Sequence, residues 1–126
     1  MSKPIRHLRN PDGSESVFWF VRVLLLRDGR HVVAQGLDVD YCAAGDSLAE
    51  AKENFTRGFI ATIEANLREF GSIDSLIAPA PAEFFRLFYK AEAAAEPESK
   101  DLDLPDDAPR KLRRLQFFQG EALSAA

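Results

Sequence analysis

The sequence contains a single cysteine, Cys42, among 126 residues. One cysteine cannot form an internal disulfide, which favours a reducing, cytoplasmic setting. No stretch approaches the roughly 20 consecutive apolar residues of a membrane-spanning helix. The first residues, Met-Ser-Lys-Pro-Ile-Arg-His, lack the apolar core of a signal peptide. We therefore expect a soluble, cytoplasmic protein.

The common catalytic motifs are also missing. The sequence has no Gly-rich phosphate loop, no spaced Cys/His metal motif and no Gly-x-Ser-x-Gly elbow. His7 and His31 have no evident partner set, and His31 is expected to be an exposed residue at a strand end. Cys42 is expected to be a small buried hydrophobic residue rather than a nucleophile. We expect neither enzymatic activity nor a cofactor.

The chain lacks an excess of positive charge. Its formal net charge of −4 gives no general electrostatic attraction to nucleic acid. Cationic residues do cluster near the end of the chain, at Arg110, Lys111, Arg113 and Arg114. This cluster could contact nucleic acid, but it follows an acidic run, which favours solvated or mutually neutralised charges.

The chain is predicted to form a single domain, because its length and its 46% apolar and 29% charged residues are ordinary for one globular unit. Residues 1–15 are polar, are broken by prolines and glycine, and are expected to form a flexible arm. Residues 16–95 form the expected α+β domain. Residues 96–126 read as an acidic linker followed by a short basic segment, which is either a helix or an edge strand.

Residues 16–27 are β-branched and aromatic and are apolar on both faces, as in a central strand covered on each side. Asp28-Gly29 is a two-residue hairpin signal leading into a return strand at 31–37. Residues 37–44 predict a third, shorter strand or a bulge. The expected fold is a small antiparallel sheet of three to four strands with a long helix on one face.

The long helix is the best-defined element. Ser47 is the expected N-cap and Glu50 completes a capping box, with its carboxylate reaching back to the amide of Ser47. Gly45 suits a turn with positive φ, and Gly71 suits a left-handed cap at the end. Apolar residues recur at helical spacing between these caps and predict one buried stripe: Leu48, Ala51, Phe55, Phe59, Ile63, Leu67 and Phe70.

A second helix is predicted over residues 82–95, with Pro81 at its first position. It is rich in aromatic residues, namely Phe84, Phe85, Phe88 and Tyr89. These residues could pack on the second face of the sheet and complete the core of the monomer. They could also form a subunit or partner interface, where aromatic residues are enriched. The two roles can coexist.

Asp38 and Asp40 are two residues apart, and on a strand they would point to the same face. Paired carboxylates suit hard cations such as Mg²⁺. No additional acid in a matching strand position is evident, so we expect no metal site. The favoured alternative is that the two residues flank a turn and are solvated, or cap the neighbouring loop.

The strand–hairpin–strand order followed by Gly45, Asp46, Ser47, Glu50, Ala51 and Asn54 resembles the HicB-like antitoxin family, which has a G-D-T/S-x-x-E-A-x-x-N helix start after its third strand. The resemblance covers roughly residues 17–70 and implies a truncated ribonuclease-H-like fold. It also implies a protein that self-associates, as family members commonly do. Many of them bind and block a small toxin ribonuclease.

Residues 72–126 show no helix-turn-helix or ribbon-helix-helix module of the kind with which typical members bind an operator. The favoured hypothesis is therefore a non-catalytic protein acting through protein–protein contact as a homodimer, with antitoxin-like neutralisation of a small ribonuclease as one form of this role. The alternatives are a nucleic-acid-associated regulator that uses the basic C-terminal cluster and a degenerate nuclease that uses Asp38 and Asp40.

Overall fold

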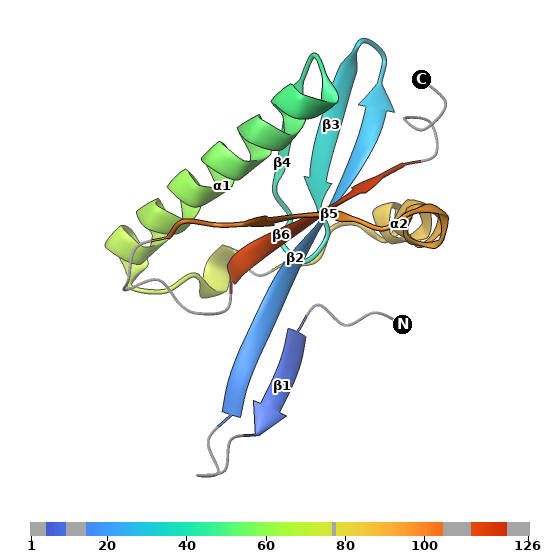
Figure 1. Ribbon diagram of the computed structural model, residues 1–126. Coiled ribbons are helices and arrows are strands. Elements are labelled where there is room, and N and C mark those ends of the chain that lie inside the picture. Colours follow the sequence, from blue (N-terminus) through green and yellow to red (C-terminus); the bar gives the residue numbers. More distant parts are fainter. Residues whose placement is uncertain (1–4, 10–14, 77, 105–111, 121–126) are drawn as a thin grey trace.

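The computed structural model describes residues 5–9, 15–76, 78–104 and 112–120 (Figure 1). Within these ranges the chain forms strands, two α-helices and one 3₁₀ turn. In chain order they are β1 (Ile5–Arg9), β2 (Glu15–Asp28), β3 (His31–Gly36), β4 (Cys42–Gly45), α1 (Leu48–Phe70), η1 (Asp74–Leu76), α2 (Ala82–Ala94), β5 (Glu98–Asp101) and β6 (Leu112–Gln119).

The described strands form one sheet of six, in the order β4-β3-β2-β6-β5, with β1 also paired to β2. β6 runs parallel to β2. All other pairings are antiparallel. The predicted α+β class is confirmed, but the sheet is larger than the expected three to four strands and is mixed rather than antiparallel.

β2 is the centre of the molecule, as its apolar sequence predicted. On one of its edges it pairs with β1 and then β3, and on the other with β6. Because side chains alternate along a strand, Val21, Val23 and Leu25 join one core cluster, whereas Leu24 joins another. Over residues 21–25, each face of β2 is therefore covered by its own layer.

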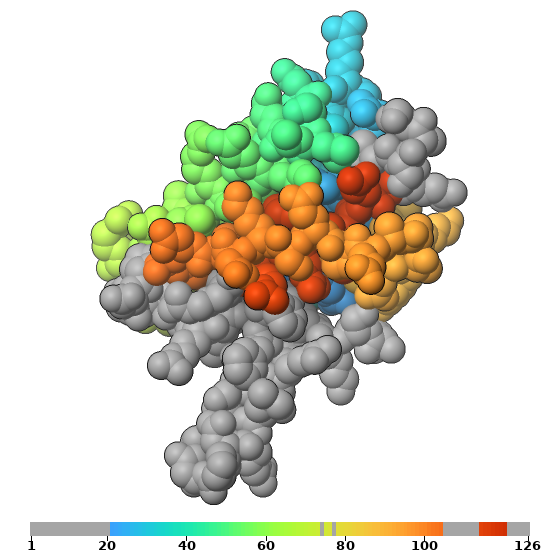
Figure 2. All heavy atoms as spheres, in the orientation of Figure 1, coloured from blue at the N-terminus to red at the C-terminus, as the bar shows by residue number. Residues whose placement is uncertain are grey.

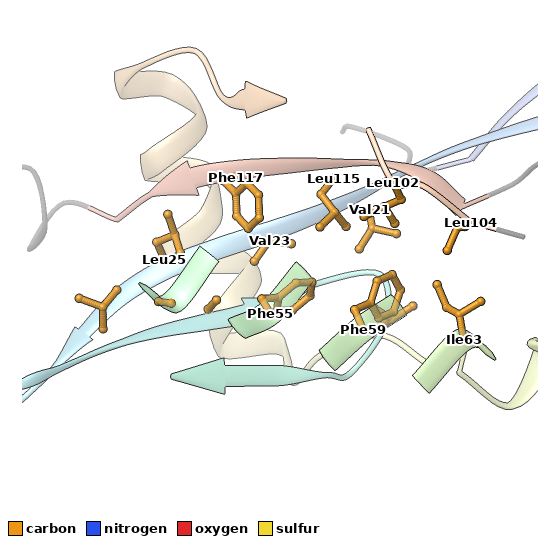
Figure 3. Close-up of a cluster of buried hydrophobic side chains, with 14 of the residues drawn as sticks. Val21, Val23, Leu25, Phe55, Phe59, Ile63, Leu102, Leu104, Leu115 and Phe117 are labelled. Atoms are coloured by element: carbon orange, nitrogen blue, oxygen red, sulfur yellow. The ribbon is translucent and has the colours of Figure 1, made fainter. Parts of the chain in front are cut away.

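Helix α1 covers one face of the sheet. Phe55, Phe59 and Ile63 are fully buried against side chains of β2 and β6 (Figure 3). Leu102 and Leu104, which follow β5, close the same cluster. The buried stripe that the sequence predicted is confirmed in its middle but ends early, because Phe70 is 64% exposed in the last turn.

The contacts at the two ends of α1 test the caps that the sequence predicts. Ser47 Oγ accepts the backbone N–H of Glu50 at 3.1 Å, which confirms the N-cap. Gly71 has φ of 71° and its N–H donates to the Leu67 carbonyl, which confirms the C-terminal cap. The Glu50 carboxylate reaches the amide of Asp46, not that of Ser47.

Gly45 lacks the positive φ that the sequence suggested. It is required for space instead, because a Cβ there would lie 2.6 Å from the backbone nitrogen of Ala51. Asn54, the last residue of the motif, donates from Nδ2 to the carbonyl of Ala44 at 2.8 Å. The motif thus ties the start of α1 to strand β4.

Helix α2 packs on the opposite face of the sheet, against a second cluster centred on Leu24, Leu37, Phe88 and Phe118 (Figure 1). The Phe88 ring meets that of Phe118 edge-on, with centroids 4.8 Å apart. The prediction that the aromatic helix completes the monomer core is therefore confirmed for Phe88.

Three segments differ from the predicted domain division. Residues 5–9, within the expected flexible arm, pair with β2 as β1, and the resulting two-stranded ribbon extends away from both helices (Figure 1). Residues 98–101, within the expected linker, form β5 at the sheet edge. The short basic segment, which the sequence predicts as either a helix or an edge strand, contains β6. This strand is an inner one, between β2 and β5. Of these segments β6 has a partner distant in sequence, whereas β1 pairs with the strand that directly follows it.

Candidate functional site

The aromatic residues of α2 divide between core and surface. Phe88 is fully buried, Phe84 and Phe85 are half-buried, and Tyr89 is 41% exposed. Leu87, which the sequence did not single out as an interface residue, is 42% exposed. Each flank of the buried stripe of this helix thus carries an apolar side chain, Leu87 on one and Tyr89 on the other, that the described part of the fold leaves in contact with solvent.

A buried ion pair lies beneath α2. Arg22, on β2, donates from Nη2 to Oδ1 of Asp38 at 2.7 Å, and its Nε lies 3.3 Å from both carboxylate oxygens. The backbone N–H of Arg22 also donates to Oδ2 of Asp38, at 2.8 Å. The two side chains are only 7% and 3% exposed. No local pattern predicts this pair, because Arg22 lies in an apolar run and Asp38 is sixteen residues away.

The ion pair is covered by aromatic rings. The guanidinium carbon of Arg22 lies 4.9 Å from the ring centroid of Phe88 and 5.7 Å from that of Phe85. Nη1 of Arg22 is buried, and it has no hydrogen-bond partner among the described residues. A buried donor without an acceptor costs about 1–3 kcal/mol of desolvation.

The two aspartates proposed as an alternative metal pair are not brought together as ligands. Both follow β3 rather than lying on a strand, and Asp38 is engaged by Arg22. Asp40 accepts a hydrogen bond from Nε2 of Gln35 at 3.0 Å. Among the residues whose positions are described, no group of three or more His, Cys, Asp or Glu side chains could hold a metal ion. The prediction of solvated acids is wrong for Asp38, whose carboxylate is buried against Arg22 of β2, whereas Asp40 is exposed.

The structure describes only part of the basic cluster. Arg110 and Lys111 lie outside the described residues, and so does the side chain of Arg113. Nε of Arg114 donates to Oδ1 of Asp101 at 2.7 Å across the β5–β6 pair. Arg114, the member of the cluster whose side chain is described, thus forms an ion pair with a neighbouring acid.

The other singled-out side chains lie near β4. Cys42 is exposed, so the prediction of a buried residue is wrong; it lies on an edge strand of the described sheet. His31 is exposed as predicted, but its Nδ1 lies 3.1 Å from Oδ1 of Asp46, a partner not foreseen. The side chain of His7 is outside the described set.

Tyr41 packs its ring against Phe55 and Phe59, with centroids 5.2 and 5.9 Å away. Burial raises the pKa of the Tyr41 hydroxyl above its ordinary value of 10.0, and the adjacent Cys42 adds to this effect. The phenol also limits residue 58 to glycine, since a Cβ there would lie 2.0 Å from the Tyr41 oxygen.

An open hollow of about 430 Å³ lies where the chain leaves α2, bounded by Glu92, Glu96, Gln116 and Phe118 among others. Figure 2 shows this side of the molecule, with β5 and the segment before it (orange) lying across β6 (red). A smaller hollow of about 170 Å³ on the other side of this segment is lined in part by Lys52. Its Nζ donates a hydrogen bond to Oε2 of Glu98 at 2.7 Å. Neither hollow contains a nucleophile paired with a base.

None of the helices in the described ranges is both long and apolar enough to cross a membrane. No protein-family model, no curated protein and no solved structure matches the chain at a significant level.

Proposed function

We propose that the chain is a non-catalytic HicB-like protein that acts through protein–protein contact and associates as a homodimer. The observation that carries the proposal is the exposure of Leu87 and Tyr89 on α2, beside the half-buried Phe84 and Phe85. Aromatic residues are enriched at protein interfaces, where one part of the ring is buried by each partner. A second copy that covers these side chains would remove apolar surface from water.

The matched motif supports the family part of the proposal. Ser47 caps α1 and Asn54 ties it to β4, so two of the residues that carry the resemblance hold the helix onto the sheet. The small sheet with a long helix on one face is consistent with the truncated ribonuclease-H-like arrangement that the resemblance implies. Neutralisation of a small ribonuclease is the form of protein contact that this family suggests, and a gene for such a toxin beside this one would support it.

Self-association is tested by sedimentation equilibrium at micromolar concentration, where the wild type is expected at twice the chain mass of 14.0 kDa. Leu87→Glu should shift the protein toward the monomer, because it places a charge in the interface and keeps the Tyr89 ring, whose centroid lies 5.7 Å from that of Phe88. Phe70→Glu is the matched control: Phe70 is the most exposed large apolar residue among the described side chains, yet it lies at the end of α1. A monomeric wild type, or equal effects of the two variants, would contradict the proposal.

A further inference from the structure

Helix α2 has no side-chain cap at either end, and its N-terminal end is held by a backbone hydrogen bond, from Ala80 to the Leu37 carbonyl at 3.0 Å. Its N-cap is Pro81, which supplies no side-chain hydrogen bond, and its last turn has no basic residue to interact with the helix dipole. Only Phe88 and Ala91 are buried along its length. Helix α1, by contrast, has a serine cap, a glycine cap and five buried residues.

The surface under α2 is poorly suited to exclude water. The Arg22–Asp38 pair has lost its hydration there, and the hydrogen bonds to Asp38 engage only Nε and Nη2 of the guanidinium. Nη1 is left without an acceptor among the described residues. A buried ion pair is favourable only when its remaining hydrogen-bonding groups are satisfied. Water reaching this site would therefore stabilise the pair that α2 now covers.

We propose that α2 is a hinged cover that opens as a unit while the rest of the sheet and α1 stay folded. Hydration of Arg22 Nη1 favours the open state, and the contacts of the guanidinium with Phe88 and Phe85 favour the closed state. Opening exposes an apolar floor that includes Leu24, Leu37 and Phe118, with the charged pair at its centre. Because the proposed dimer also uses side chains of α2, exchange is compared at two protein concentrations: opening within a single chain does not depend on concentration, whereas opening linked to the dimer does.

Native-state hydrogen exchange tests the cover directly, because it measures the opening equilibrium of each segment separately. In the wild type the amides of α2 should open at least about tenfold more often than the central amides of α1. Asp38→Asn leaves a buried Arg22 charge uncompensated, so it should increase the opening of α2 further. The double variant Arg22→Met/Asp38→Asn removes both charges and keeps an acceptor for the backbone N–H of residue 22, so opening of α2 should fall below that of Asp38→Asn alone.

Two further variants make the test specific. Phe88→Leu removes the aromatic face over Arg22 and should increase the opening of α2, even if the double variant fails to fold. Ile63→Val in the α1 cluster is the control, since it weakens the opposite face and should leave the opening of α2 at its wild-type value. Equal opening of α1 and α2 in the wild type would overturn the proposal. So would α2 exchange that is unchanged in Asp38→Asn and Phe88→Leu.

Discussion

At the scale of single residues, the informative positions are those where a side chain meets backbone. Ser47, Asn54 and Gly45 fix the junction between β4 and α1 through a cap, a hydrogen bond and a close backbone approach. Local sequence predicted the cap, because the donor is three residues away. The prediction that residue 45 is glycine because of a positive φ is wrong. A side chain at this position is excluded by the backbone of Ala51.

Ser47→Ala should lower the free energy of unfolding by about 0.5–2 kcal/mol, because it removes the acceptor for the Glu50 amide. Ser47→Asn retains a side-chain acceptor and should stay close to the wild type. Thermal or urea melts of the three proteins measure the difference. An alanine variant as stable as the wild type would show that the cap contributes nothing.

Tyr41 should titrate above its ordinary pKa of 10.0, because burial favours the neutral phenol. The folded state then holds its proton to a higher pH than the unfolded state, so stability should fall as the pH rises above 10.0. Near-ultraviolet absorbance can follow this, since the chain has only two tyrosines, Tyr41 and Tyr89. Tyr41→Phe should abolish the late transition and Tyr89→Phe should keep it; the reverse pattern would contradict the assignment.

At the scale of elements, the two helices differ in what specifies them. Helix α1 is defined by its caps and by a stripe of apolar residues, signals that lie within the helix itself. Helix α2 has a proline start and no side-chain cap, and it depends on what its aromatic residues meet. Its Phe85 and Phe88 rings lie over the guanidinium of Arg22. The pairing of Arg22 with Asp38 cannot be predicted from the sequence around either residue alone.

The strands also divide into those that local sequence specifies and those that depend on a distant partner. The hairpin of β2 and β3 was predicted because its two strands are joined by two residues. Strand β6 is parallel to β2 and pairs with residues nearly a hundred positions earlier. No local signal reports such a partner, so its basic and apolar sequence fitted a helix and an edge strand equally well.

At the scale of the whole molecule, β6 binds the fold together. It lies between β2 and β5 and contributes Leu115 and Phe117 to the α1 cluster and Phe118 to the α2 cluster. A domain that ended at residue 95, as the sequence suggested, would lack an inner strand. Both layers of the core would then be incomplete.

A chain truncated after Ala95 should therefore fail to fold. The exposed edge of β2 and the uncovered faces of Phe55 and Phe88 would remain in water. Circular dichroism and a urea titration would detect the loss of a cooperative transition. Arg114→Ala in the full chain, which removes one half-exposed side chain of β6, is the control and should unfold cooperatively. A truncated chain with a normal transition would show that β6 is dispensable.

The sequence by itself determined the α+β class, the central position of β2, the hairpin after it and the capped helix α1. These features depend on contacts within a few residues or on the polarity of one segment. The tertiary structure alone decided the parallel partner of β2, the role of Asp38 and the division of the α2 aromatic residues between core and surface. Each of these depends on which distant segments meet, and a residue's own type does not specify the partner that will bury it or neutralise its charge.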